Sequence, residues 1–180
     1  MDSWQLFYEG KLQSAPSARQ LRVQRRVANV HPVVFVPVAG VAVAGNGTSV
    51  YNTAEVDAVL RVVQRLQRAA VPGSIGVVTF YRAQYGKLQA ALQRAGLGPA
   101  GVALRTVDSV QGLEYDYVVV STVRTQPTAF LMDAQRVNVA ISRARRGVVV
   151  VGHRGMLSKA RLWKKIVPRA RAMTPAEICA

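Results

Sequence analysis

Three segments of this chain combine residue types that could bind a nucleotide or a phosphate. The first runs from Thr79 through Tyr81 and Arg82 to Gln84, at the end of an apolar run. A hydroxyl and free amide groups at a predicted helix start can bind a phosphate. Threonine is also an ordinary helix cap. Taken alone, this segment therefore fits a purely structural role as well.

The second segment runs from Val107 to Asp116 and is polar, with a turn at Gly112. It leads directly into an apolar run that begins at Tyr117. Its carboxylates and its amide suit the hydroxyls of a ribose and partners that carry phosphate. A solvated loop with a turn glycine is the other interpretation. The segment alone leaves both open.

The third segment, 138–147, predicts a helix that delivers Arg143 and Arg145 near its C-terminal end. Cations at that end are favoured by the helix dipole, so these side chains could serve stability alone. A guanidinium can also neutralise charge on a transferring γ-phosphate, the role called an arginine finger. The residue types permit either role.

Strands and helices must alternate around these segments. Short apolar runs predict strands at 33–36, 75–80, 102–107, 117–123 and 148–151. Apolar residues at helical spacing predict helices: one capped by Thr53, then 82–95, 133–144 and about 157–166. This alternation indicates a parallel sheet with helices on both faces. We expect the strand-to-helix turns along one edge and ligands at the carboxyl ends of the strands.

The chain of 180 residues fits one domain, and half of its residues are hydrophobic. We expect a basic lead-in at 1–32, an α/β domain at 33–167 and a polar tail at 168–180. No apolar run approaches the roughly 20 residues that span a bilayer, and the first residues do not resemble a signal peptide. The single cysteine, Cys179, fits a reducing compartment. These features predict a soluble protein of the cytoplasm or nucleus.

Charge is the strongest compositional signal, with 24 Lys and Arg against nine Asp and Glu and a net charge of +15. Such a charge attracts polyanions, nucleic acids above all. An arginine-rich solvated surface is the alternative interpretation.

Together and in this order, the three segments resemble motifs IV, V and VI of the second RecA-like domain of superfamily 1 helicases. Those motifs commonly read T-P-Y-x-x-Q, V-D-x-x-Q-G-x-E-x-D and N-V-A-x-T/S-R-A-R. This chain has T-F-Y-R-A-Q, V-D-S-V-Q-G-L-E-Y-D and N-V-A-I-S-R-A-R. The flanks, including residues 6–12 and 47–55, resemble the up-frameshift RNA helicases. Phe80 and Leu113 depart from the pattern, where the family usually has proline and often has arginine.

The resemblance implies a RecA-like fold, similar to the P-loop NTPases, that lacks its own Walker A loop. It implies Arg143 as the arginine finger, with Arg145 as a weaker candidate. Glu114 would bind the ribose, and Gln111 and Gly112 would help to link the nucleotide to the nucleic acid.

On the nucleic-acid side, the resemblance implies that Thr79, Tyr81, Arg82 and Ser109 face a single strand, with RNA favoured. ATP and Mg²⁺ would be held mainly by an N-terminal RecA-like domain of the same protein. Because neither a Walker A loop nor a magnesium motif occurs in these residues, we expect no ATPase or unwinding activity from this chain alone, and no metal site within it.

Two other classes of function remain. A non-enzymatic module could keep the fold and bind nucleic acid through its basic surface alone. An interaction domain could instead dock an acidic protein, in which case RNA would not compete with that partner.

Overall fold

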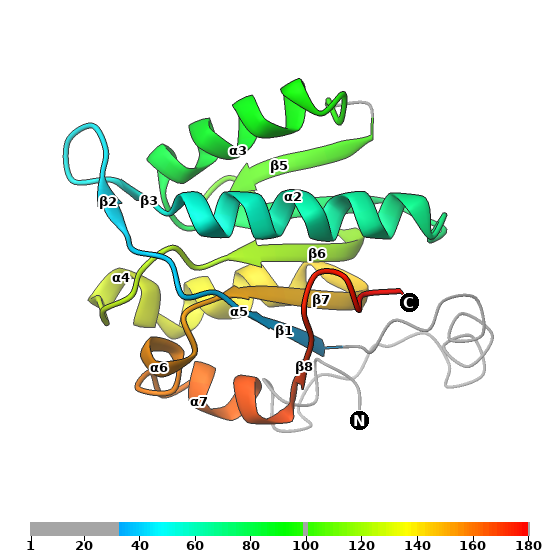
Figure 1. The fold of residues 1–180 in the computed structure, drawn as a ribbon. Helices are drawn as coiled ribbons and strands as arrows, with labels where there is room; N and C mark the ends of the chain where they lie inside the picture. Colours follow the sequence, from blue (N-terminus) through cyan, green and yellow to red (C-terminus); the bar gives the residue numbers. More distant parts are fainter. Residues whose placement is uncertain (1–32, 99–100, 180) are drawn as a thin grey trace.

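The computed structural model describes residues 33–98 and 101–179 (Figure 1). Its centre is a six-stranded sheet in the order β5-β4-β6-β7-β1-β8, in which every pair is parallel. In chain order the strands are β1 (Val33–Pro37), β4 (Ile75–Thr79), β5 (Val102–Thr106), β6 (Tyr115–Ser121), β7 (Ala144–Gly152) and β8 (Arg171–Ala172). A small hairpin of β2 (Val43–Ala44) and β3 (Val50–Tyr51) stands apart from the sheet. The predicted basic lead-in, 1–32, lies outside the described residues.

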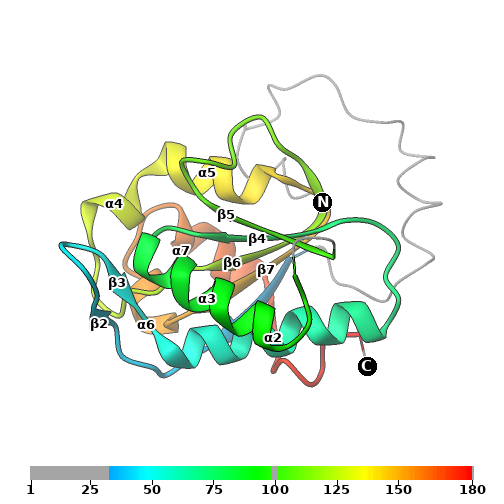
Figure 2. The ribbon, with the colours of Figure 1, turned by 90° about the horizontal axis from the view of Figure 1, so that it is seen from above.

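Helices cover both faces of the sheet (Figures 1 and 2). The two long helices, α2 (Thr53–Arg68) and α3 (Arg82–Arg94), pack on one face. The other face carries α4 (Ala129–Met132), α5 (Ala134–Ser142), α6 (Arg154–Leu157) and α7 (Trp163–Ile166), followed by the short 3-10 helix η2 (Val167–Arg169). The predicted α/β, RecA-like architecture of a parallel sheet between helices is confirmed.

Strand residues alternate between two cores, which explains why the central strands are almost wholly apolar. In β6, Val118 and Val120 belong to the core beneath α5 and α7, whereas Val119 belongs to the core beneath α2 and α3. All three are completely buried. A strand with both faces covered needs an apolar residue at nearly every position.

Several predicted boundaries are wrong. Asn52, not Thr53, caps α2, because its side chain accepts a hydrogen bond from the Glu55 amide. The predicted strand 117–123 begins earlier, at Tyr115, and ends at Ser121; Val123 has a φ of 70°, which no strand accommodates. The helix predicted to reach residue 144 ends at Ser142, and β7 starts at once.

The predicted polar tail is not a separate tail. β8 pairs with β1 and extends the sheet, and Ile178 is 1% exposed in the core beneath α2. Among the described residues, no helix is long and apolar enough to cross a membrane.

The candidate residues lie at two opposite edges of the sheet rather than at one. We call the start of the strands the amino edge and their end the carboxyl edge. β6 has seven residues, so these edges lie about 20 Å apart. Ligands were expected at the carboxyl ends of the strands, but the second and third segments end at the amino edge, because α5 and the helix-free segment 107–114 each carry the chain back to that edge before the next strand begins.

Candidate functional site

Arg143 lies at the amino edge, between the end of α5 and the start of β7. Its Nη1 donates to the Leu113 carbonyl at 3.2 Å, its Nε to the Val139 carbonyl at 3.1 Å and its Nη2 to the Ser142 hydroxyl at 2.9 Å. In return, the Arg143 carbonyl accepts a hydrogen bond from the Tyr115 amide at 2.8 Å. The guanidinium is therefore oriented by neutral acceptors, which leave its positive charge uncompensated.

Glu114 and Arg145 also lie at the amino edge and form an ion pair, 2.9 Å between Oε2 and Nε. Both side chains are more than half exposed. The carboxylate proposed for a ribose is thus engaged with the second candidate arginine in this structure. An exposed pair of this kind contributes at most about 1 kcal/mol, so a ligand can displace it.

Gln111 and Gly112 are exposed in the turn that precedes these residues. Gly112 has a φ of 80°, in the left-handed region that favours glycine. The Leu113 amide closes the turn with a 3.1 Å hydrogen bond to the Val110 carbonyl. Because the Leu113 carbonyl accepts a hydrogen bond from Arg143, the backbone conformation at Gly112 influences the orientation of the guanidinium.

The segment 107–114 connects the two edges physically. It leaves the carboxyl end of β5, crosses the face that carries α5, and reaches the amino end of β6. Val107 and Val110 anchor it in the core, and Asp108 pairs with Arg136 of α5 at 3.3 Å. Ser109 therefore belongs to the carboxyl end of this segment and Glu114 to the amino end.

At the carboxyl edge, the structure corrects the prediction for Thr79. Its side chain is completely buried, and its hydroxyl is 3.5 Å from the Tyr81 amide, from which it accepts a hydrogen bond. Because the Thr79 side chain is completely enclosed at the end of β4, a phosphate cannot reach its hydroxyl in this conformation. Tyr81 is 8% exposed, and its hydroxyl is 3.1 Å from that of Thr128. Little of the Tyr81 side chain is therefore accessible to a ligand.

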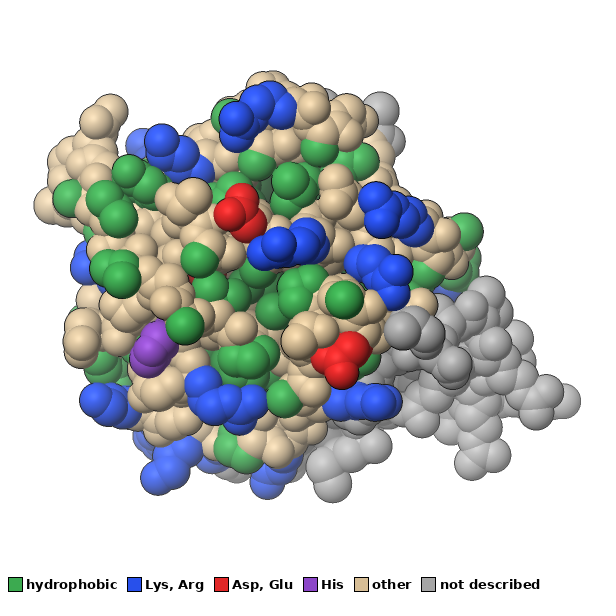
Figure 3. Space-filling model, in the orientation of Figure 1, with side chains coloured by type: hydrophobic (Ala, Val, Ile, Leu, Met, Phe, Trp, Pro, Cys, Tyr) green, Lys and Arg blue, Asp and Glu red, His purple; other side chains and the backbone are tan. Residues whose placement is uncertain are grey.

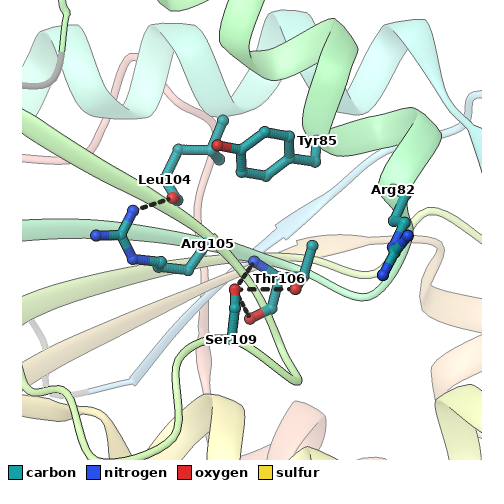
Figure 4. A pocket seen from close by; sticks show the side chains of 6 residues that line it. All are labelled: Arg82, Tyr85, Leu104, Arg105, Thr106 and Ser109. Atoms are coloured by element: carbon teal, nitrogen blue, oxygen red, sulfur yellow. Dashed lines mark hydrogen bonds between the residues drawn. The ribbon is translucent and has the colours of Figure 1, made fainter.

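Arg82 and Ser109 line a groove of about 490 Å³ beside the edge strand β5 (Figure 4). Tyr85, Leu104, Arg105 and Thr106 complete its lining. The Ser109 hydroxyl bonds to Thr106, whereas the exposed Arg82 side chain makes no hydrogen bond with the other residues that line the groove. The structure thus brings two predicted nucleic-acid residues to one surface groove with a further arginine, Arg105.

The face that carries α2 and α3 has dispersed basic side chains. Figure 3 shows this face, where the described Lys and Arg side chains are scattered among few acidic groups rather than gathered in one patch.

Comparison with known proteins identifies the family. The family model described as an AAA domain matches residues 3–155 of this chain. The chain belongs to this AAA domain family. It is 35% identical over 176 residues to the regulator of nonsense transcripts 1 homolog of Neurospora crassa. The matched region covers 90% of this chain and 16% of that protein. Relatives of that name confirm the predicted resemblance to the up-frameshift group of superfamily 1 helicases.

Further relatives of this AAA domain are helicases by name. An uncharacterized ATP-dependent helicase of Methanocaldococcus jannaschii is 29% identical over 93% of this chain and 26% of that protein. The C-terminal domain of a possible DNA helicase from Lactobacillus plantarum superposes with a TM-score of 0.58 at 17% identity, covering 88% of this chain and 98% of that one. The chain thus spans at most about a quarter of these curated relatives, and the solved structure shows the same fold.

The AAA domain also contains a buried polar cluster that the site predictions missed. Glu55, Asn52, Gln84 and Ser121 meet at the carboxyl edge and hydrogen-bond to one another or to Val123. Burial raises the pKa of Glu55 from 4.5 to about 7, opposed by hydrogen bonds from Ser121 and from the Val123 and Thr122 backbone. The signal in the sequence was a carboxylate at an apolar position of the α2 pattern, one turn before Val59.

Proposed function

We propose that this chain is the C-terminal motor domain of an ATP-dependent helicase, and that Arg143 contacts the γ-phosphate of ATP bound between it and an N-terminal RecA-like domain. The observation that carries the proposal is the uncompensated guanidinium of Arg143 at the amino edge. Its three hydrogen-bond acceptors are neutral and hold it in one orientation. A fixed cation that is not paired with a carboxylate suits a developing phosphate charge.

The neighbouring arginines support this choice by contrast. Arg145 pairs with Glu114, Arg146 with Asp116 at 2.9 Å, and Arg136 with Asp108. Their charges are already balanced, at least in part, by carboxylates. Among the described arginines of this edge, Arg143 is the one whose bonds leave a full charge for a ligand.

ATP would supply the transferring phosphoryl group, and this chain's residues would bind and orient it. Arg143 would face the γ-phosphate, and Glu114, released from Arg145, would accept hydrogen bonds from the ribose hydroxyls. Gln111 and Gly112 lie in the segment that joins the two edges, which suits a link between nucleotide and nucleic acid. Among the described residues, no group of three or more His, Cys, Asp or Glu side chains could hold a metal ion. We propose, from the resemblance to the helicase motifs, that Mg²⁺ is held mainly by the N-terminal domain.

The nucleic acid would lie along the carboxyl edge, where Arg82 and Ser109 line the groove beside β5. Arg82, Arg105 and the exposed Ser109 hydroxyl suit the phosphates of a nucleic-acid backbone rather than base edges, and the resemblance to the helicase motifs favours a single strand. RNA is favoured over DNA by the relatives named as regulators of nonsense transcripts, although another relative, from mouse, is named a 5'-3' DNA helicase.

The experiment compares this chain alone with a two-domain protein, in which the chain follows an N-terminal RecA-like domain that carries a phosphate-binding loop. The chain alone is expected to hydrolyse no ATP, and the two-domain protein to hydrolyse it faster when single-stranded RNA is added. Hydrolysis at similar rates by the isolated chain would contradict the proposal. RNA binding without hydrolysis by the two-domain protein would favour a non-enzymatic binding module.

A further inference from the structure

The buried carboxylate of Glu55 is directed at one backbone group. Both of its oxygens accept the Val123 amide, at 3.0 and 2.9 Å, and Oε2 also accepts the Ser121 hydroxyl at 2.7 Å. Glu55 has no exposed surface. Burying an ionised carboxylate costs free energy unless hydrogen bonds compensate for the lost water. The contacts with Val123 and Ser121 supply that compensation, and they tie the start of α2 to the segment that follows β6.

Val123 is held in a strained conformation. Its φ of 70° is uncommon for any residue other than glycine and is an outlier for a β-branched side chain, at a cost on the order of 1–3 kcal/mol. The Arg124 amide donates to the Thr122 carbonyl at 2.8 Å and closes a tight three-residue turn. Asn52 donates from Nδ2 to the Val123 carbonyl at 3.3 Å. Side chains from the start of α2 therefore fix the peptide groups on both sides of Val123.

This turn sets the direction of Arg124. Its guanidinium carbon lies 5.3 Å from the centre of the Tyr81 ring. Among the described residues, no carboxylate pairs with Arg124, and its buried Nε has no hydrogen-bond partner. Tyr81 is itself fixed by Thr128 and by the ring of Phe130, 5.6 Å away between centroids. A guanidinium that rests on a packed ring and has no acid partner retains its donors for an anion.

We propose that Glu55 is a positioning residue, which acts through the strained turn at Val123 to hold Arg124 over Tyr81, and that Arg124 there binds a phosphate of single-stranded nucleic acid. The inference rests on the proposed function, because it needs the strand to run along the carboxyl edge. Arg82, which lines the groove beside β5, immediately follows Tyr81 in the chain. Neither Glu55 nor Arg124 is marked by the three helicase motifs.

The test measures binding of a fluorescein-labelled oligouridylate to the full 180-residue chain in a double-mutant cycle. Arg124→Ala is expected to weaken binding about tenfold. It should also reduce the slope of the logarithm of the binding constant against the logarithm of the salt concentration by about one. Glu55→Ala removes the acceptor for the Val123 amide and is expected to weaken binding comparably. In the Arg124→Ala background, Glu55→Ala should have little further effect, because both changes remove the same contact.

Two variants separate positioning from folding. Glu55→Gln keeps an acceptor for Val123 and is expected to retain most of the affinity. Should Glu55→Ala fail to fold, Glu55→Asp takes its place in the cycle, since it keeps the charge but withdraws the oxygens by one methylene. Arg68→Ala, an exposed arginine at the far end of α2, is the matched control and should change affinity less than twofold.

The outcomes are distinguishable. No binding by the wild-type chain would overturn the proposed nucleic-acid path and this inference with it. Binding that survives Arg124→Ala unchanged would overturn the inference alone. An equal loss of affinity from Glu55→Ala in the wild-type and Arg124→Ala proteins would mean that Glu55 stabilises the fold in general and does not position Arg124.

Discussion

Arg143 and Leu113 are joined by a 3.2 Å hydrogen bond from the guanidinium to the backbone carbonyl. Since the Tyr115 amide also donates to the Arg143 carbonyl, the end of α5 and the end of the 107–114 segment are tied at two points. The orientation of the guanidinium therefore depends on the backbone of that segment. A substitution in the turn at Gly112 should therefore alter the orientation of the Arg143 guanidinium, although Arg143 itself is unchanged.

Gly112→Ala tests this dependence. Gly112 has a φ of 80°, and an added Cβ would meet nothing within 4 Å, so the cost is conformational and about 1 kcal/mol. Gly47→Ala is the matched control, because Gly47 has a φ of 63° and equally open surroundings in the β2–β3 turn. Both variants should lose similar stability in urea, whereas RNA-stimulated ATPase of the two-domain protein should fall only with Gly112→Ala. Equal ATPase activity in both variants would contradict the proposal that the turn at Gly112 controls the orientation of Arg143.

The ion pair between Glu114 and Arg145 gives a second prediction. Since both side chains are largely exposed, Glu114→Gln should change the free energy of unfolding by less than about 1 kcal/mol. If Glu114 binds the ribose, the same variant should raise KM for ATP in the two-domain protein more than it lowers kcat. Steady-state kinetics at several ATP concentrations separate these effects. An unchanged KM would remove Glu114 from the nucleotide site.

The layers of this fold were predicted well from the sequence. Strands such as β4 and β6 need apolar residues on both faces, and α2 has apolar residues at helical spacing. The sequence could not predict the division of the motifs between two edges. That division depends on the segment 107–114, which returns to the amino edge without a helix and whose buried anchors, Val107 and Val110, look like loop residues.

The placement of the candidate site residues in the fold was predicted in part, and their roles stay predictions. Arg143 and Glu114 were expected on a shared edge and lie there, although it is the amino edge. Thr79 was assigned to a phosphate, but a motif does not reveal that its hydroxyl is enclosed at a strand end. Arg124 was missed because its significance comes from the turn at Val123, and a left-handed valine has no signature in the sequence.

Glu55 makes stability depend on pH. Burial raises its folded-state pKa to about 7, above the value of 4.5 that serves as reference for the unfolded chain. Between these values the folded chain binds the extra proton, so the free energy of unfolding falls as pH rises from about 4.5 to 7 and this contribution then stays constant. The fall attributable to Glu55 is roughly 3 kcal/mol.

Urea unfolding at a series of pH values measures this effect. Glu55→Gln cannot titrate, so the wild type should lose stability relative to this variant across that pH window. Asp57→Asn, which changes an exposed carboxylate of the same helix, should leave the fall in place. Parallel profiles for the wild type and Glu55→Gln would show that the carboxylate is not desolvated as described.

Trp163 links α7 to the core on the α5 face. It is completely buried, and its Nε1 donates to the Leu131 carbonyl at 3.2 Å. Trp163→Phe should lower the free energy of unfolding by about 2–4 kcal/mol, since it leaves a cavity and a carbonyl without its donor. Met132→Ala, at an exposed position beside the acceptor, should change it by less than about 0.5 kcal/mol. Thermal and urea denaturation measure both.

The central claim is that Arg143 at the amino edge acts on the nucleotide. The most direct measurement is RNA-stimulated ATP hydrolysis by the two-domain protein with Arg143→Ala, beside Arg94→Ala as a control at an exposed position of α3. We predict that Arg143→Ala lowers kcat by about 10³–10⁵ while RNA affinity stays within a few-fold of the wild type, and that Arg94→Ala changes neither. A kcat for Arg143→Ala within tenfold of the wild type would contradict the account.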